Sequence, residues 1–70
     1  MNKVWVVSWG CDYEGYSGWE LYHHQAEAFI SAKKYRDGGE WKLKEADDII
    51  GRYHWESFGD HVYVEEMEIK

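Results

Sequence analysis

The stretch Val4-Trp5-Val6-Val7-Ser8-Trp9 is the densest apolar run of the sequence. It is built from β-branched and aromatic residues, which are typical of a β-strand. Side chains alternate along a strand, so the odd-numbered residues share one face and the even-numbered residues share the other. Both faces carry apolar side chains. We therefore expect a central strand that is covered on at least one face and has neither face exposed to water.

The size of the chain limits what this strand can be part of. Seventy residues predict a single domain over residues 1–70. The one cysteine, Cys11, excludes an intramolecular disulfide. Aromatic residues make up 19% of the chain, with five Trp and six Tyr. So small a body cannot bury all of them, and exposed Trp and Tyr are residues that anchor protein interfaces.

The segment after this strand predicts a hairpin and then a helix. Glycines at 10, 15 and 18 mark a long loop, and Trp19 to Tyr22 is the expected return strand. From His23 to Arg36 the apolar spacing, three alanines and basic last turn favour a helix, which the following glycines end. We expect its buried face to carry Ala26, Phe29 and Ile30.

Residues 41–51 fit two secondary structures. Alternation of Trp41 and Leu43 with lysines suggests a short strand. A longer set with helical spacing favours a second helix at about 43–50 that ends at Gly51; its members are Leu43, Ala46, Ile49, Ile50 and Tyr53. Its outward face would carry Glu45, Asp47 and Asp48.

Residues 52–60 read as an aromatic, irregular segment, and residues 61–69 as the last strand. The last strand places two valines on one face, with Met67 and Ile69 on the other. Either a β-bulge near Glu65-Glu66 realigns them, or the two ends of the strand pack against different parts. The predicted fold class is α+β: a small antiparallel sheet of about three strands packed on one main helix, with a possible short second helix.

The charge of −6 is unevenly distributed. Residues 1–36 hold four acids and four bases, whereas residues 37–70 hold ten acids and four bases. An acidic half suits a basic partner and argues against direct nucleic-acid binding, which needs Lys and Arg. The competing interpretation is that the acids only keep an aromatic-rich protein in solution. The predicted partner-binding residues are six acids and two loop tyrosines: Glu45, Asp47, Asp48, Glu65, Glu66, Glu68, Tyr13 and Tyr16.

No motif in the sequence indicates catalysis, a metal or a cofactor. The four histidines lack ligand spacing, with no His-x-x-x-His and no Cys-x-x-Cys. Cys11 stands beside an acid and without a spaced histidine base, so we expect no enzyme. No run reaches the roughly 20 apolar residues of a membrane span, and no signal peptide is evident. We expect a cytoplasmic protein that needs no cofactor, metal or membrane.

Three segments carry a resemblance: Val4-Trp5-Val6-Val7, the helical run Ala26–Lys34, and Val62-Tyr63-Val64-Glu65-Glu66. Together they resemble the small, acidic, uncharacterised proteins of bacteriophages and prophages, and in size and charge the chain is similar to anti-CRISPR proteins. The resemblance implies a non-enzymatic module that acts in the host cytoplasm. The resemblance also implies that this module blocks a basic, nucleic-acid-binding surface of a host defence protein. The alternative is a structural or assembly protein that self-associates, as a homodimer for example, through exposed aromatics.

Overall fold

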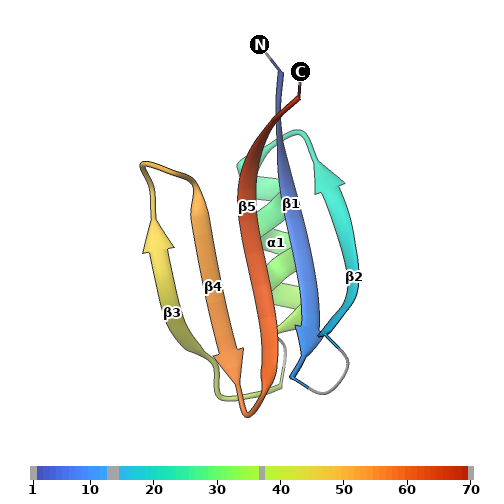
Figure 1. The fold of residues 1–70 in the computed structure, drawn as a ribbon, viewed down its shortest axis with the longest axis vertical. Helices are drawn as coiled ribbons and strands as arrows, with labels where there is room; N and C mark the ends of the chain where they lie inside the picture. Colours follow the sequence, from blue (N-terminus) through green and yellow to red (C-terminus); the bar gives the residue numbers. More distant parts are fainter. Residues whose placement is uncertain (1, 13–14, 37, 70) are drawn as a thin grey trace.

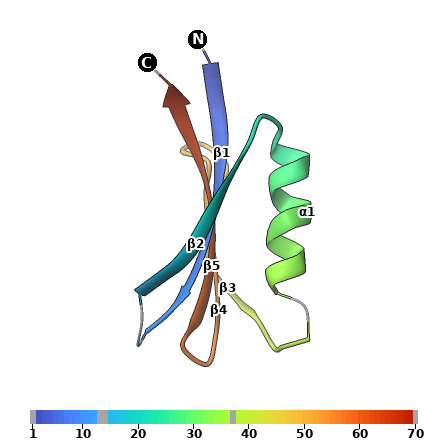
Figure 2. The same ribbon diagram turned by 90° about the vertical axis from the view of Figure 1, so that its right-hand side faces the viewer.

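The chain folds into a five-stranded antiparallel sheet with a helix on one of its faces (Figures 1 and 2). A computed structural model describes residues 2–12, 15–36 and 38–69. The sheet has the strand order β2-β1-β5-β4-β3. Its elements, in chain order, are β1 (Asn2–Cys11), β2 (Gly15–Tyr22), α1 (Gln25–Tyr35), β3 (Lys42–Asp47), β4 (Arg52–Ser57) and β5 (Asp60–Ile69).

The opening apolar run lies inside β1, which pairs with β2 on one side and β5 on the other. The first and last strands of the chain are therefore antiparallel neighbours in the sheet. Helix α1 covers the odd-numbered face of β1, and Val7 on that face is fully buried. The opposite face of the sheet carries no helix (Figure 2). We call it the uncovered face.

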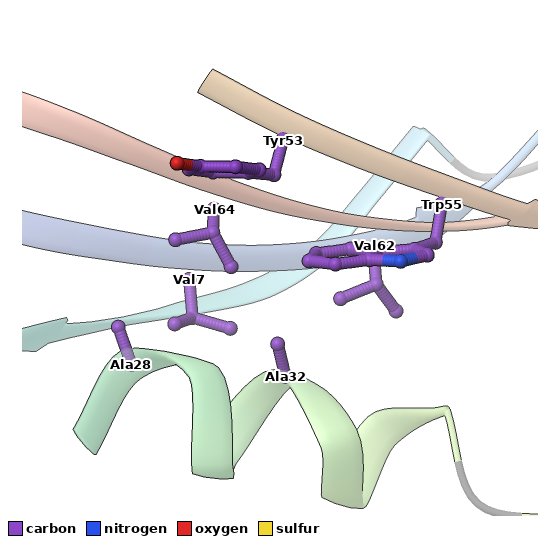
Figure 3. Packing of buried hydrophobic residues seen from close by; sticks show 7 residues of the cluster. All are labelled: Val7, Ala28, Ala32, Tyr53, Trp55, Val62 and Val64. Atoms are coloured by element: carbon purple, nitrogen blue, oxygen red, sulfur yellow. The ribbon is translucent and has the colours of Figure 1, made fainter. Parts of the chain in front are cut away.

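The core lies between α1 and the sheet, where small helical residues meet large strand residues. Ala28 and Ala32 point from α1 toward Val7, Val62 and Val64 (Figure 3). Tyr53 and Trp55 of β4 close the cluster, and Phe29 meets both rings edge-on at centroid distances of 4.8 and 6.1 Å. Because the Tyr53 and Trp55 side chains are large, only small residues fit on the side of α1 that faces the sheet.

The predicted buried face of the helix is wrong in two of its three members. Ala28, Ser31 and Ala32 are buried, whereas Ala26 is exposed and Ile30 is 62% exposed. Helical spacing identified α1 correctly but not its rotation. Close packing on aromatic rings selects alanine and serine over the larger isoleucine.

The expectation of about three strands and a second helix is also wrong. Residues 42–47 form β3 and residues 52–57 form β4, so the sheet gains two strands and the hairpins β3–β4 and β4–β5. The residues that seemed to form one helical face belong to β3, to the turn after it and to β4. Of that set, Tyr53 is buried, whereas Leu43 is 55% exposed and Ile49 is 96% exposed. Because β3 is an exposed edge strand, its sequence carries no buried alternation.

The last strand has no bulge. Its register with β1 runs without a shift from Asn2↔Ile69 to Cys11↔Asp60. Its two ends do pack differently, as the alternative held. Val62 and Val64 face the helix, whereas Met67 is on the uncovered face and 51% exposed.

Candidate functional site

The turn between β3 and β4, residues 47–51, carries the most exposed large apolar side chain of the described residues. We call it the hairpin tip (Figure 1). Ile49 is 96% exposed and Ile50 is 52% exposed. Water therefore surrounds the Ile49 side chain and reaches about half of Ile50, and neither residue belongs to the core cluster.

Hydrogen bonds hold the hairpin tip in place. The Asp47 carboxylate accepts from the backbone N–H groups of Ile49 and Ile50, at 2.9 and 3.2 Å. The N–H of Gly51 donates to the Asp47 carbonyl at 2.8 Å. Gly51 has a φ of 71°, and a Cβ there would lie 2.6 Å from the Cβ of Glu66. A side chain at position 51 would therefore both strain the backbone and collide with β5.

The first group of predicted binding acids lies on this hairpin instead of on a helix. Asp47 fixes the turn, and Asp48 accepts a hydrogen bond from the Tyr53 hydroxyl. That bond raises the pKa of Tyr53, because the bonded carboxylate disfavours the phenolate. Glu45 is exposed and makes no hydrogen bond or ion pair among the described residues. Two of these three acids therefore support the local structure.

The second group, on β5, meets the first at the hairpin tip. The N–H of Glu66 donates to the Gly51 carbonyl at 2.8 Å, so β5 touches the tip directly. Glu65 lies 4.0 Å from Arg52 Nε, and Glu66 lies 3.1 Å from Lys3 Nζ. Both are ion pairs at the surface, which contribute little stability.

Glu68 is exposed near the end of β5. Tyr13 lies outside the described residues. The backbone of Tyr16 belongs to β2, and its side chain lies outside the described part of the structure. Five acids therefore gather around the hairpin tip, with Glu68 further along the same strand: Glu45, Asp47, Asp48, Glu65 and Glu66.

A second polar cluster lies on the uncovered face at the other end of the sheet. His61 Nε2 is 2.7 Å from Asp12 Oδ1, and His61 Nδ1 is 2.8 Å from His54 Nε2. Tyr63 stacks on His54 with ring centroids 4.2 Å apart. Partial burial, followed by the nearby His61, lowers the pKa of His54. The sequence pattern did not predict this cluster, although a hairpin turn at residues 58–59 brings positions 54 and 61 together diagonally.

The cluster borders a cavity of about 350 Å³, which Cys11 and His61 both line. A nucleophilic thiol needs a histidine nitrogen free to take its proton. Both ring nitrogens of His61 are already bonded, to Asp12 and to His54. The arrangement therefore does not form a cysteine–histidine pair. Within residues 2–12, 15–36 and 38–69, His, Cys, Asp and Glu side chains form no group of three that could hold a metal ion.

No protein-family model, curated protein or solved structure matches this chain. Among the described residues, no helix is long and apolar enough to cross a membrane.

Proposed function

We propose that this chain is a non-catalytic protein-binding module, and that its hairpin tip docks on a basic surface of its partner. The observation that carries the proposal is the 96% exposure of Ile49 in a turn that is held by hydrogen bonds. Single exposed apolar residues are common on protein surfaces. Two adjacent, exposed isoleucines on a turn that is held by hydrogen bonds and has carboxylates beside it form a combination that favours a binding role.

A fixed turn supports binding because its main chain is already ordered before association, so no further conformational entropy of the main chain is lost. Immobilising a flexible loop side chain costs about 0.5–1.5 kcal/mol. Here the Asp47 carboxylate and the Gly51 backbone already order the main chain. Ile49 and Ile50 can therefore act as anchors that enter an apolar pocket of the partner.

The surrounding acids give the module its preference for a basic partner. Residues 37–70 carry the whole net charge of −6. Arg52 and Lys3 offset Glu65 and Glu66 only partly, which leaves Glu45, Asp47 and Asp48 as the local excess. Such a field speeds association with a positive surface.

The charge and the resemblance to phage proteins also suggest the kind of partner. Carboxylates that replace phosphates would block a nucleic-acid-binding surface of a host defence protein. The module would then act in the host cytoplasm, where the single thiol of Cys11 stays reduced. A role as a self-associating assembly protein is the second candidate, and the exposed β2 strand favours it.

The test neutralises the acids while it preserves their hydrogen bonds. Asn keeps the acceptor oxygen at positions 47 and 48, so Asp47→Asn and Asp48→Asn remove charge but leave the turn bonds possible. A partner captured from bacterial lysate by the wild-type chain is identified, purified and titrated with this double variant and with Ile49→Ser. The matched control is Glu27→Gln, which removes one exposed charge on α1.

We expect slower association for the double variant, faster dissociation for Ile49→Ser, and no change for the control. The difference between wild type and double variant should shrink as salt rises, because the Debye length falls from about 30 Å at 0.01 M to about 10 Å at 0.1 M. Nucleic acid should compete with the wild-type chain for the partner. Equal affinity of all four chains at every salt concentration would refute the proposal.

A further inference from the structure

The two edge strands of the sheet differ in how they are protected against pairing. Four of the six residues of β3 are charged. Charged side chains are one way in which natural proteins block an edge. Strand β2 has one charged residue, Glu20, among eight. Its outer edge is open in Figure 2, with no other element beside it.

The carboxylate of Glu20 does not protect that edge. It accepts hydrogen bonds from the hydroxyls of Tyr22 and Tyr35, the latter at 2.5 Å. Both partners lie on the helix side of the sheet, so the charge is held away from the uncovered face. These bonds lower the pKa of Glu20, so the group stays ionised there.

On the uncovered face, β2 presents apolar side chains. Trp19 is opposite Ser8 and Leu21 is opposite Val6 in the register with β1, so both point away from α1. Trp19 is 64% exposed and Leu21 is 53% exposed. An unpaired strand edge together with an exposed apolar row is the combination that a further strand would cover.

We propose that the occupant is β2 of a second copy of this chain, paired antiparallel about a two-fold axis perpendicular to the sheet. In an antiparallel pair, residues directly opposite each other point to the same face of the sheet. A two-fold axis perpendicular to the sheet must therefore pass between two copies of the same residue. An axis at Glu20 would place two carboxylates opposite each other, which is unfavourable. An axis at Trp19 places the two Trp19 side chains together and sets Glu20 against Gly18.

The irregularity within β2 leaves this register intact near the axis. The shift in pairing with β1 falls beyond Trp9↔Gly18, so residues 18–22 keep a regular strand geometry. Glu20 is the one charged residue of β2, so this register brings no two charged side chains opposite each other.

The resulting dimer has one continuous sheet of ten strands, with both helices on the same side. The two hairpin tips lie at its outer ends, since β3 is the strand farthest from β2 (Figure 1). Nine spacings of about 4.8 Å separate the outermost strands by roughly 43 Å. The dimer therefore presents two hairpin tips at once. The inference specifies the self-association named above as the second candidate function, and it does not depend on docking by the hairpin tip.

Sedimentation equilibrium of the whole chain tests the dimer. We expect a mass that rises with concentration from 8.4 kDa toward twice that value. Trp19→Lys places two ammonium groups across the axis, and we expect it to raise the dimer dissociation constant at least tenfold. Ile49→Lys is the control, since it makes the same charge change at the other edge and should leave the constant unaltered. A single-copy mass at all concentrations, or equal constants for the two variants, would overturn the proposal.

Disulfide trapping tests the register independently of that comparison. In a Cys11→Ser background, Trp19→Cys should form a cross-linked dimer under mild oxidation, while Ile49→Cys should not. Cross-linking through Glu20→Cys in place of Trp19→Cys would overturn the proposed axis. A strand from a different protein on this edge would leave the pure chain monomeric and uncross-linked, which also counts against the proposal.

Discussion

Replacement of Asp47 tests whether the acids at the hairpin tip have a structural role as well as a charge. In Asp47→Ala, the N–H groups of Ile49 and Ile50 lose the acceptor that lies 2.9 and 3.2 Å away. This bonding resembles that of a helix N-cap, where replacement by Ala costs about 0.5–2 kcal/mol. With two donors affected, we expect a loss of about 1–2 kcal/mol in the free energy of unfolding.

That loss is large for so small a domain. A core of this size supplies on the order of 3–5 kcal/mol of net stability. Each kcal/mol shifts the melting temperature of a 60–100-residue domain by about 4–8 °C, so Asp47→Ala should melt roughly 5–15 °C below the wild type. Urea unfolding followed by tryptophan fluorescence measures the free energy directly.

Two further variants separate the hydrogen bonds from the charge. Asp47→Asn keeps an acceptor oxygen and should recover most of the lost stability. Glu45→Ala removes an exposed acid of the same hairpin that makes no hydrogen bond or ion pair in the described chain, and should change stability by less than about 0.5 kcal/mol. Equal stabilities for Asp47→Ala and Glu45→Ala would refute the structural role of Asp47.

Three other predictions concern the core and the titrating groups. Trp55→Ala removes a ring that packs under Phe29 and should cost about 3–5 kcal/mol, whereas Ile30→Ala on the exposed side of α1 should change little; similar urea midpoints would show that the core is misplaced. The pKa of His54 is lowered, so the unfolded chain binds the proton first and stability should fall as pH drops below about 6.5; the decline should be weaker in His54→Gln, and an unchanged decline would assign it to other groups. The hydrogen bond to Glu20 raises the pKa of Tyr35 to about 12, and Glu20→Gln should return it toward 10 in an ultraviolet titration; an unaltered titration would contradict that bond.

Elements with a strong local pattern could be predicted from the sequence. The apolar run of β1 and the valines of β5 predicted two strands, and the structure pairs them along their whole length. The helix was visible from its alanines and from the glycines after it. In each case the residues that form the element also identify it, because burial and local propensity agree.

Elements defined by tertiary contacts could not be predicted in this way. Strand β3 is exposed, so its sequence records charges and no core alternation. The rotation of α1 depends on the size of Tyr53 and Trp55, which lie far along the chain. Because the β3–β4 hairpin was not predicted, the hairpin tip was not predicted either. Ile49 and Ile50 fitted the buried face of a helix in the sequence, although the structure exposes both.

Isoleucine-methyl NMR tests the central claim most directly, because it reports which apolar side chains touch the partner. Ile49 and Ile50 lie at the hairpin tip, while Ile30 lies on the outer side of α1. On titration with the purified partner, we predict that the methyl signals of Ile49 and Ile50 shift or broaden while that of Ile30 stays unchanged. A complex that forms with the signals of Ile49 and Ile50 unaltered would contradict the account.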